Sequence, residues 1–204
     1  MGVQKQSLEL SKGRPLGLMA LHALSLSPLK EVAVVVHPDD SLTWIKAMSE
    51  VPGKETLTCM PAVHVVICPE ASGGMSYSIR SGLAALMSDG QELDAVVVAL
   101  ADQPFVSERT IIRLIDYWRM HPELDYVASK AKHNEETADV LMPPVLIASS
   151  MFEALHGLKG DSGARQLFKS SAFQGCGLVV LDEMALHDVD TPSDMDLARK
   201  HFQA

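Results

Sequence analysis

The stretch AVVVALADQP (residues 95–104) decides the fold class of this chain. Its first six residues form a valine-rich apolar run without a polar interruption, the pattern of a strand that is buried on both faces of a parallel sheet. Asp102 follows that run after Ala101, so we expect its carboxylate at the carboxyl end of the sheet, where open α/β folds bind ligands. The stretch therefore predicts a buried strand that delivers a carboxylate to a ligand-binding edge.

Similar runs recur along the chain and alternate with segments of helical apolar spacing. Further strands are expected at 32–36, 63–67, 125–128, 145–148 and 178–181. Helices are expected at 16–26, 42–48, 76–87, 107–120, 151–156, 164–169 and 193–202, the last with Ser193 as N-cap. This alternation predicts one α/β domain over residues 1–204, a three-layer sandwich with a mostly parallel, doubly wound, Rossmann-like sheet.

Composition narrows the classes of function. The 204 residues carry a formal net charge of -9, which repels a polyphosphate backbone, so nucleic acid is not an expected partner. The apolar runs are far shorter than the roughly 20 residues of a membrane helix, and the three cysteines form no CxxC pair. We therefore expect a cytoplasmic protein that does not associate with membranes.

Two carboxylates from distant parts of the chain are candidate metal ligands. Asp102 follows the strand described above, and Asp190 lies in HDVDTP (residues 187–192), between the last expected strand and the last expected helix. Mg²⁺ is commonly held by one or two carboxylates together with phosphate oxygens and waters. The alternative is structural: Asp102 caps a helix or shapes a turn, and Asp190 shapes the Thr-Pro turn.

A glycine turn precedes the expected helix at 76–87. In GGMSYSIRSGL (residues 73–83) the glycines expose backbone amides to an anion or a base, and Ser76, Ser78 and Arg80 add polar groups near the helix start. A glycine turn with a serine cap is the competing structural interpretation.

GDSGAR (residues 160–165) is another glycine turn that leads into an expected helix, with Asp161 or Ser162 as cap and Arg165 as a candidate anion contact.

The polar stretch 130–139 is expected to be a surface loop, either an ordinary connection or one that closes over a substrate.

Together these segments occur in the order found in the MobA-like nucleotidyltransferases, and the chain resembles in particular the branch of molybdenum cofactor cytidylyltransferases. That family's pattern reads LAAGxSxRMGxxK, GMSxSLxxGL, LADQPxV, GHPVLF, GDxGAR and DIDTPxD. The matching segments here are GMSYSIRSGL (74–83), LADQPFV (100–106), GDSGAR (160–165) and DVDTPSD (188–194).

The resemblance implies a Mg²⁺-dependent enzyme that transfers CMP, or another NMP, from a nucleoside triphosphate, with CTP expected, to the phosphate of a molybdopterin-type acceptor and releases pyrophosphate. It implies a role in purine metabolism beside a molybdoenzyme such as xanthine dehydrogenase. By resemblance, Asp102 and Asp190 hold the metal, and Lys5 balances the charge of the departing pyrophosphate. The nucleotide is expected at Gly74, Ser76, Ser78 and Arg80, and the acceptor at Asp161 and Arg165.

Two segments depart from the family pattern. Residues 1–5 resemble only the tail of the leading loop, so the first strand and most of the phosphate loop are missing from the sequence, and the sheet is expected to have two unpaired edges. In MPPVL (142–146) a proline replaces the family's histidine. The missing strand favours an alternative, a noncatalytic cofactor carrier or adaptor for a molybdoenzyme. A sugar-phosphate or isoprenoid nucleotidyltransferase is the other alternative.

Overall fold

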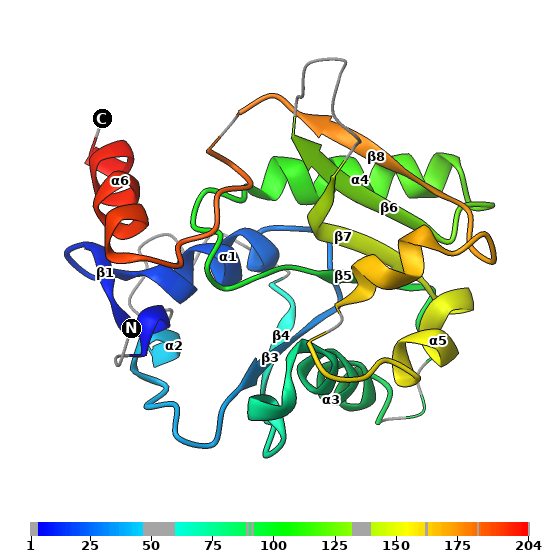
Figure 1. Ribbon diagram of the computed structural model, residues 1–204, viewed down its shortest axis with the longest axis horizontal. Coiled ribbons are helices and arrows are strands. Elements are labelled where there is room, and N and C mark those ends of the chain that lie inside the picture. The colour runs from blue at the N-terminus through cyan, green and yellow to red at the C-terminus, as the bar shows by residue number, and fades with distance from the viewer. Residues whose placement is uncertain are drawn as a thin grey trace.

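The computed structural model describes residues 4–46, 60–88, 90, 92–131, 140–161, 163–182 and 184–203, and it contains the expected alternation of strands and helices (Figure 1). The strands are β1 (Glu9–Ser11), β2 (Arg14–Pro15), β3 (Glu31–Val36), β4 (Ala62–Ile67), β5 (Ala95–Val98), β6 (Tyr126–Ala131), β7 (Leu141–Ala148) and β8 (Gly175–Val180). The α-helices are α1 (Leu16–Ser25), α2 (Thr43–Lys46), α3 (Met75–Leu86), α4 (Glu108–Met120), α5 (Phe152–His156) and α6 (Pro192–Gln203). Short 3₁₀ helices are η1 (Lys5–Ser7), η4 (Ala71–Gly73), η5 (Ser149–Met151) and η6 (Ala164–Lys169).

Every expected strand and helix has a counterpart, although the expected helix at 164–169 is the 3₁₀ helix η6. The end of the expected helix 42–48 and most of the predicted loop 130–139 lie outside the described residues. The β1–β2 hairpin and η1 were not predicted, because strands of two or three residues are too short to show a periodic pattern.

The strands form mixed sheets. β3 and β4 pair in parallel, and the second sheet has the order β5-β7-β6-β8, with β7 antiparallel to both of its neighbours and β8 parallel to β6. The direction of β7 follows from its short connection to β6, since a parallel crossover needs a dozen or more residues. The apolar pattern alone gave no signal for this reversal, because antiparallel strands that are buried on both faces are equally apolar.

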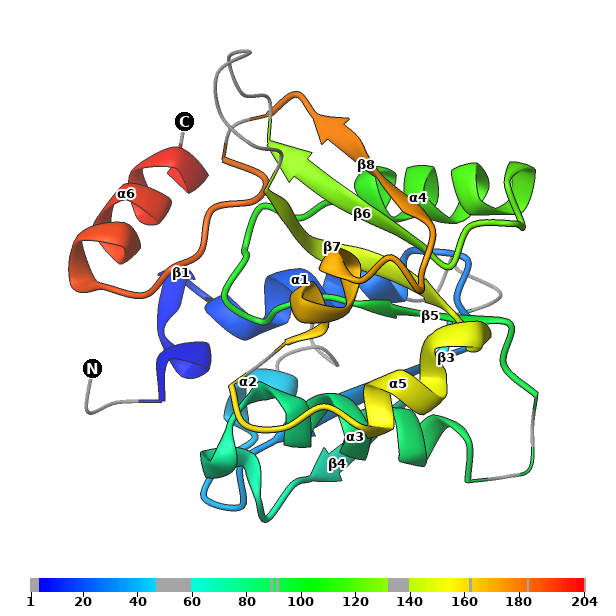
Figure 2. The same ribbon diagram turned by 45° about the vertical axis from the view of Figure 1, so that its right-hand side comes forward.

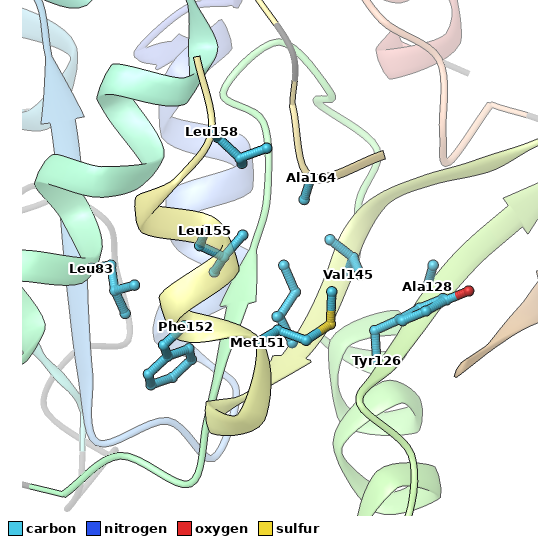
Figure 3. Close-up of a cluster of buried hydrophobic side chains, with 10 residues drawn as sticks. Leu83, Tyr126, Ala128, Val145, Met151, Phe152, Leu155, Leu158 and Ala164 are labelled. Carbon is cyan, nitrogen blue, oxygen red and sulfur yellow. The ribbon is translucent and has the colours of Figure 1, made fainter. Parts of the chain in front are cut away.

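Helices cover both faces of the larger sheet, which confirms the α/β three-layer arrangement. On one face, α1 and α4 pack against Val127 and Leu146. On the other face, α3 and α5 pack against Ala128, Val145 and Ile147, and Figure 3 shows part of this cluster around Met151 and Leu155. Neighbouring residues of β6 and β7 thus point to opposite layers, as pleated strands require. Burying each large side chain contributes about 1.5–3 kcal/mol.

The amino-terminal segment packs against the carboxyl-terminal helix, and this contact positions the site described below. Leu10 and Leu16 form a buried cluster with Val189, Met195 and Ala198, so the β1–β2 hairpin lies beside α6 in both views (Figures 1 and 2). The segment that precedes α6 is thereby brought to the residues that precede β1.

The N-cap of α6 differs from the prediction. The helix begins at Pro192, and the residue that caps it is Thr191 rather than Ser193. The Thr191 hydroxyl accepts a hydrogen bond from the Asp194 amide at 3.2 Å, and the Asp194 carboxylate accepts one from the Thr191 amide at 2.8 Å. This reciprocal pair satisfies two amides at once, as a capping box does, and Pro192 suits the first helical position because it has no amide to satisfy.

Among the described residues no helix is long and apolar enough to cross a membrane.

Candidate functional site

The two predicted metal-binding carboxylates converge, and Lys5 joins them. The Lys5 Nζ atom lies 2.8 Å from Asp102 Oδ2 and 2.8 Å from Asp190 Oδ1. Lys5 also donates a hydrogen bond to the Val189 carbonyl at 3.3 Å, and the Val189 amide donates to the Asp102 carbonyl at 2.9 Å. The end of β5, the segment before α6 and the amino-terminal segment therefore meet at one point.

The electrostatics of this cluster favour a protonated Lys5. Burial of the amine opposes protonation, but the hydrogen bonds and charges of Asp102 and Asp190 outweigh that effect and raise the pKa of Lys5 above its ordinary value of 10.5. The Asp102 carboxylate is 21% exposed and the Asp190 carboxylate 67% exposed. An ammonium group thus links two carboxylates that open towards solvent.

The same oxygen atoms suit a divalent cation. The second oxygen of Asp102, Oδ1, is buried and has no hydrogen-bond partner, so that carboxylate keeps unused acceptor capacity. Carboxylate oxygens are the ligands that hard cations such as Mg²⁺ and Mn²⁺ prefer. Within the described ranges no group of three or more His, Cys, Asp or Glu side chains is arranged around a metal site. A pair of carboxylates is nevertheless sufficient for Mg²⁺ when substrate phosphates and waters complete the shell.

A cavity of about 1040 Å³ lies between β3 and β5, with the carboxylate cluster at one end. Five of the residues singled out from the sequence line it: Lys5, Gly74, Ser78, Asp102 and Asp161. Four others do not: Ser76, Arg80, Arg165 and Asp190. The structure therefore places half of the metal, nucleotide and acceptor candidates, together with Lys5, around one space.

The two glycine turns are in direct backbone contact. Gly74 has φ +117° and ψ 172°, a conformation that is essentially limited to glycine. A Cβ atom at Gly74 would lie 2.4 Å from the carbonyl carbon of Gly160 and 2.6 Å from the Asp161 nitrogen. The Ser76 amide donates a hydrogen bond to the Gly160 carbonyl at 3.1 Å. The predicted nucleotide turn and the predicted acceptor turn therefore form one unit.

Three predicted binding residues lie outside the cavity, for different reasons. Ser76 is completely buried, and its hydroxyl has no hydrogen-bond partner. The Arg80 guanidinium donates to the Leu158 carbonyl at 2.8 Å and lies 4.5 Å from the centre of the Tyr77 ring, so it holds α3 to the end of α5. Arg165 is exposed in η6.

Sequence reasoning missed two residues at the polar end of the cavity. The Gln4 amide group donates to the Asp39 carbonyl and accepts from the Ser41 amide at 3.0 Å, which ties the amino-terminal segment to the end of β3. His37 lies 3.0 Å from the Ser72 hydroxyl. His37 follows a valine run directly, so the rule that selected Asp102 also applies to it, whereas Gln4 carried no sequence signal.

Beneath the cluster, Gln103 and Asp188 place polar groups in the interior. Gln103 is completely buried, and neither polar atom of its amide makes a hydrogen bond of acceptable geometry. Burial raises the pKa of Asp188 above its ordinary value of 3.8, and the charges of Asp102 and Asp190 add to this rise, whereas the nearby Gln103 amide opposes it. Asp188 therefore stabilises the fold less when it is ionised than when it is protonated.

We expect Asp188→Asn to raise the melting temperature at neutral pH by about 2–4 °C, the shift that ~1 kcal/mol produces in a domain of this size. The folded-state pKa of Asp188 is raised, so its protonated form stabilises the folded protein. This contribution is fully present below pH 3.8 and is lost as the pH rises through the folded-state pKa. The gain should therefore shrink towards zero on acidification to about pH 3. Thermal melts of parent and variant with a chelator present measure this gain in melting temperature. A variant that melts below the parent at neutral pH would contradict the prediction.

The fold and the site together define an α/β protein with a carboxylate pair at the end of a sheet strand, beside a large cavity. The sequence model of the MobA-like NTP transferase domain matches residues 1–175. The chain is also 34% identical over 202 residues to the purine catabolism protein PucB of Bacillus subtilis (strain 168), an alignment that covers 98% of this chain and 90% of PucB. The chain therefore belongs to the MobA-like NTP transferase family, and its function is of the nucleotidyltransferase type.

Solved structures show the same fold. Rv0371c from Mycobacterium tuberculosis H37Rv in complex with manganese matches with a TM-score of 0.67 and 21% identity, over 96% of this chain and 91% of that one. CMP:2-keto-3-deoxy-manno-octonic acid synthetase complexed with CTP matches with a TM-score of 0.66 and 14% identity, over 98% of this chain and 91% of that one. These identities support the fold assignment only.

Proposed function

We propose that this chain is a single-domain cytidylyltransferase that transfers CMP from CTP to the phosphate of a molybdopterin-type acceptor and releases pyrophosphate. The observation that carries this proposal is the convergence of Asp102 and Asp190 on Lys5 at one end of the cavity. Supporting it are the four ordered sequence motifs, the family membership, the PucB relative in purine catabolism and the CTP-bound structural neighbour. A molybdoenzyme such as xanthine dehydrogenase is the proposed recipient of the product.

The proposed reaction is an in-line displacement at the α-phosphorus of the triphosphate. An oxygen of the acceptor phosphate forms the new bond to that phosphorus, and the bond to pyrophosphate breaks, so the leaving group carries away the electron pair. Because the acceptor phosphate is already an anion, no side chain has to remove a proton. The protein must instead align two polyanions that repel each other and stabilise the charge that develops between them.

Asp102 and Asp190 are the proposed ligands of a divalent cation, which supplies Lewis-acid charge neutralisation at the phosphate oxygens when it is bound. The manganese complex of Rv0371c supports a divalent ion in this fold. Lys5 adds a positive charge at the same end of the cavity and is proposed to balance the departing pyrophosphate.

The remaining roles are assigned by whether each residue lines the cavity. Gly74 and Ser78 are proposed to contact the nucleotide, and Asp161 to face the acceptor, because all three line the cavity. Ser76 and Arg80 are proposed to act from behind by fixing α3, since Ser76 is buried and Arg80 is bonded to the Leu158 carbonyl. Arg165 is exposed, which leaves it free to meet an anionic acceptor at the outer rim.

The proposal is tested by two measurements in sequence. Isothermal titration with CTP and Mg²⁺ measures nucleotide binding, and pyrophosphate release is then followed with and without a molybdopterin acceptor. We expect CTP binding that depends on Mg²⁺ or Mn²⁺, pyrophosphate release only with the acceptor present, and weaker turnover with ATP or GTP. Acceptor binding without pyrophosphate release would instead identify a cofactor carrier, and turnover with a sugar phosphate in place of the molybdopterin would identify a different transferase.

Substituting Lys5 by alanine is expected to lower turnover by at least about tenfold, because each ~1.4 kcal/mol of lost charge stabilisation is worth that factor. The same change should tighten divalent-cation binding in the absence of nucleotide, because it removes the ammonium that lies between the two carboxylates. Pyrophosphate release and metal titration measure the two effects. Lys12→Ala, at an exposed position, is the matched control and should change neither quantity. An unchanged rate for Lys5→Ala would contradict its role.

A further inference from the structure

Gln103 carries a polar side chain into the interior at a position where packing alone favours an apolar one. The residue is completely buried, and neither its Nε2 nor its Oε1 atom has a hydrogen-bond partner among the described residues. Burying an amide group without partners costs free energy, and an apolar side chain of similar size avoids that cost. Gln103 therefore calls for a functional explanation.

The surroundings of Gln103 belong to the carboxylate cluster. Gln103 follows Asp102 in the sequence, and the Asp102 carbonyl accepts a hydrogen bond from the Val189 amide at 2.9 Å, which brings Asp188 alongside. The Oδ1 atoms of Asp102 and Asp188 are both buried and have no partner in the described structure. The Gln103 amide lies close enough to Asp188 to lower the pKa of that carboxyl, although the pair does not meet the full geometry of a hydrogen bond. A group of buried polar atoms thus lies on the inner side of the proposed metal ligands.

Asp188 is a third carboxylate at this site, and it needs a hydrogen-bond donor. Burial and the two neighbouring carboxylates raise its pKa, whereas the Gln103 amide and the charge of Lys5 oppose that rise. Lys5 has no donor left for it, because an ammonium group has three N–H bonds and those of Lys5 point to the two proposed metal ligands and to the Val189 carbonyl. Among the described residues, the Gln103 amide is therefore the donor that remains to hold Asp188.

The proposed metal site works best with two carboxylates rather than three. Mg²⁺ takes one or two carboxylates and leaves its other positions to phosphate oxygens and waters. Asp188 lies two residues before Asp190 and is only half-buried, so a turn of its side chain would bring a third carboxylate towards the same ion. That carboxylate would hold the ion more tightly, but it would occupy a position that a substrate phosphate needs.

We infer that Gln103 is a positioning residue for the proposed metal site. Its buried N–H group holds the Asp188 carboxylate on the inner side of the cluster, so that Asp102 and Asp190 alone face the cation. The inference rests on the proposed function, because it takes a divalent cation to bind between these two carboxylates. The unfavourable burial of the amide is then a loss of stability that the site requires for its function.

The test is titration of Gln103→Met with Mn²⁺ in the absence of nucleotide. Methionine keeps the length of the glutamine side chain but has no N–H donor. We expect Mn²⁺ binding, followed by electron paramagnetic resonance of the free ion, to tighten by about fivefold or more, because one more carboxylate reaches the ion. Pyrophosphate release should fall by about tenfold, because that carboxylate competes with substrate phosphate. Gln174→Met makes the same change at an exposed position and should alter neither quantity.

A second background shows whether Gln103 acts through Asp188. In Asp188→Ala, adding Gln103→Met should leave the Mn²⁺ affinity within about twofold of Asp188→Ala alone, because no third carboxylate remains to turn outward. If Gln103→Met does not fold, Gln103→Leu removes the same donor with a smaller side chain and is measured in both backgrounds. Melting curves with a chelator present verify that each variant is folded at the temperature of the titration.

The outcomes separate this inference from the proposed function. Unchanged Mn²⁺ binding by Gln103→Met would overturn the inference, and weaker binding together with a lower melting temperature would make the role of Gln103 purely structural. Equal tightening in the Asp188→Ala background would mean that Gln103 acts on a different group. In each of these cases the parent still binds Mn²⁺, and the proposed reaction stands. A parent that binds no divalent cation would overturn both.

Discussion

Replacing Asp102 by asparagine should reduce pyrophosphate release by at least about a thousandfold, because the proposed metal site loses the carboxylate that β5 places at the cavity and with it more than ~4 kcal/mol of charge stabilisation. The fold should survive, since asparagine has nearly the same shape, its amide oxygen can still accept the hydrogen bond from Lys5, and Asp102 Oδ1 has no hydrogen-bond partner to lose. Divalent-cation affinity should fall together with the rate. Pyrophosphate release at saturating CTP and metal titration measure the two effects.

A matched control is Asp116→Asn, which makes the same chemical change at an exposed position on α4, where the carboxylate lies 3.5 Å from the Arg119 guanidinium. That variant should retain the parent's rate and metal affinity, because an exposed ion pair within a helix contributes only a few tenths of a kcal/mol. Full activity in Asp102→Asn would remove this carboxylate from the proposed metal site, and an equal loss in both variants would point to a general defect in the preparation.

Gly74→Ala is expected to lower the free energy of unfolding by about 2–4 kcal/mol. Two causes act together. The backbone conformation at φ +117° is strained for any residue with a Cβ atom, and that atom would lie within 2.6 Å of the backbone of Gly160 and Asp161. The obstacle is main chain rather than the flexible end of a side chain, so relief requires the two turns to separate. Urea unfolding measures the loss of free energy, provided that the m value, the slope of the free energy against urea concentration, is the same for variant and parent.

Gly13→Ala is the control at a glycine of positive φ that has no contact at its Cβ position. Gly13 also has a positive φ, +73°, but no atom lies within 4 Å of the position its Cβ would take. That variant should therefore lose only about 1 kcal/mol, the cost of the left-handed conformation alone. If the two variants lose the same free energy of unfolding, the contact between the two glycine turns does not contribute to stability. Separation of the turns should also weaken CTP binding by Gly74→Ala, because Gly74 and Asp161 line the same cavity.

Much of the architecture could be predicted because its signals are local. A short valine run predicts a strand, and this rule found β3, β4 and β5 and placed Asp102 correctly after the end of β5. The expectation that each of these strands is buried on both faces was wrong for β4, where Val65 and Ile67 are exposed. The helical spacing likewise found α1, α3 and α4 within a residue or two of their ends. The order of the motifs also identified the family.

Three features could not be predicted: two depend on contacts between distant segments, and one depends on a local geometry that the sequence does not fix. The reversal of β7 depends on its pairing with β5 and β6, and the capping of α6 by Thr191 depends on one local turn geometry among several that the sequence permits. The hydrogen bond from Arg80 to the Leu158 carbonyl depends on how α3 meets α5. A residue's type and spacing predict its element, whereas its partner is set by how the elements pack.

The sequence by itself determined the α/β class, the strand that carries Asp102 and the membership in a family of nucleotidyltransferases. Only the tertiary structure decided that Lys5 lies between Asp102 and Asp190 and that the two glycine turns are in backbone contact. The reason is physical: local sequence sets backbone preference and apolar periodicity, but the packing of α6 against the β1–β2 hairpin brings the two ends of the chain together.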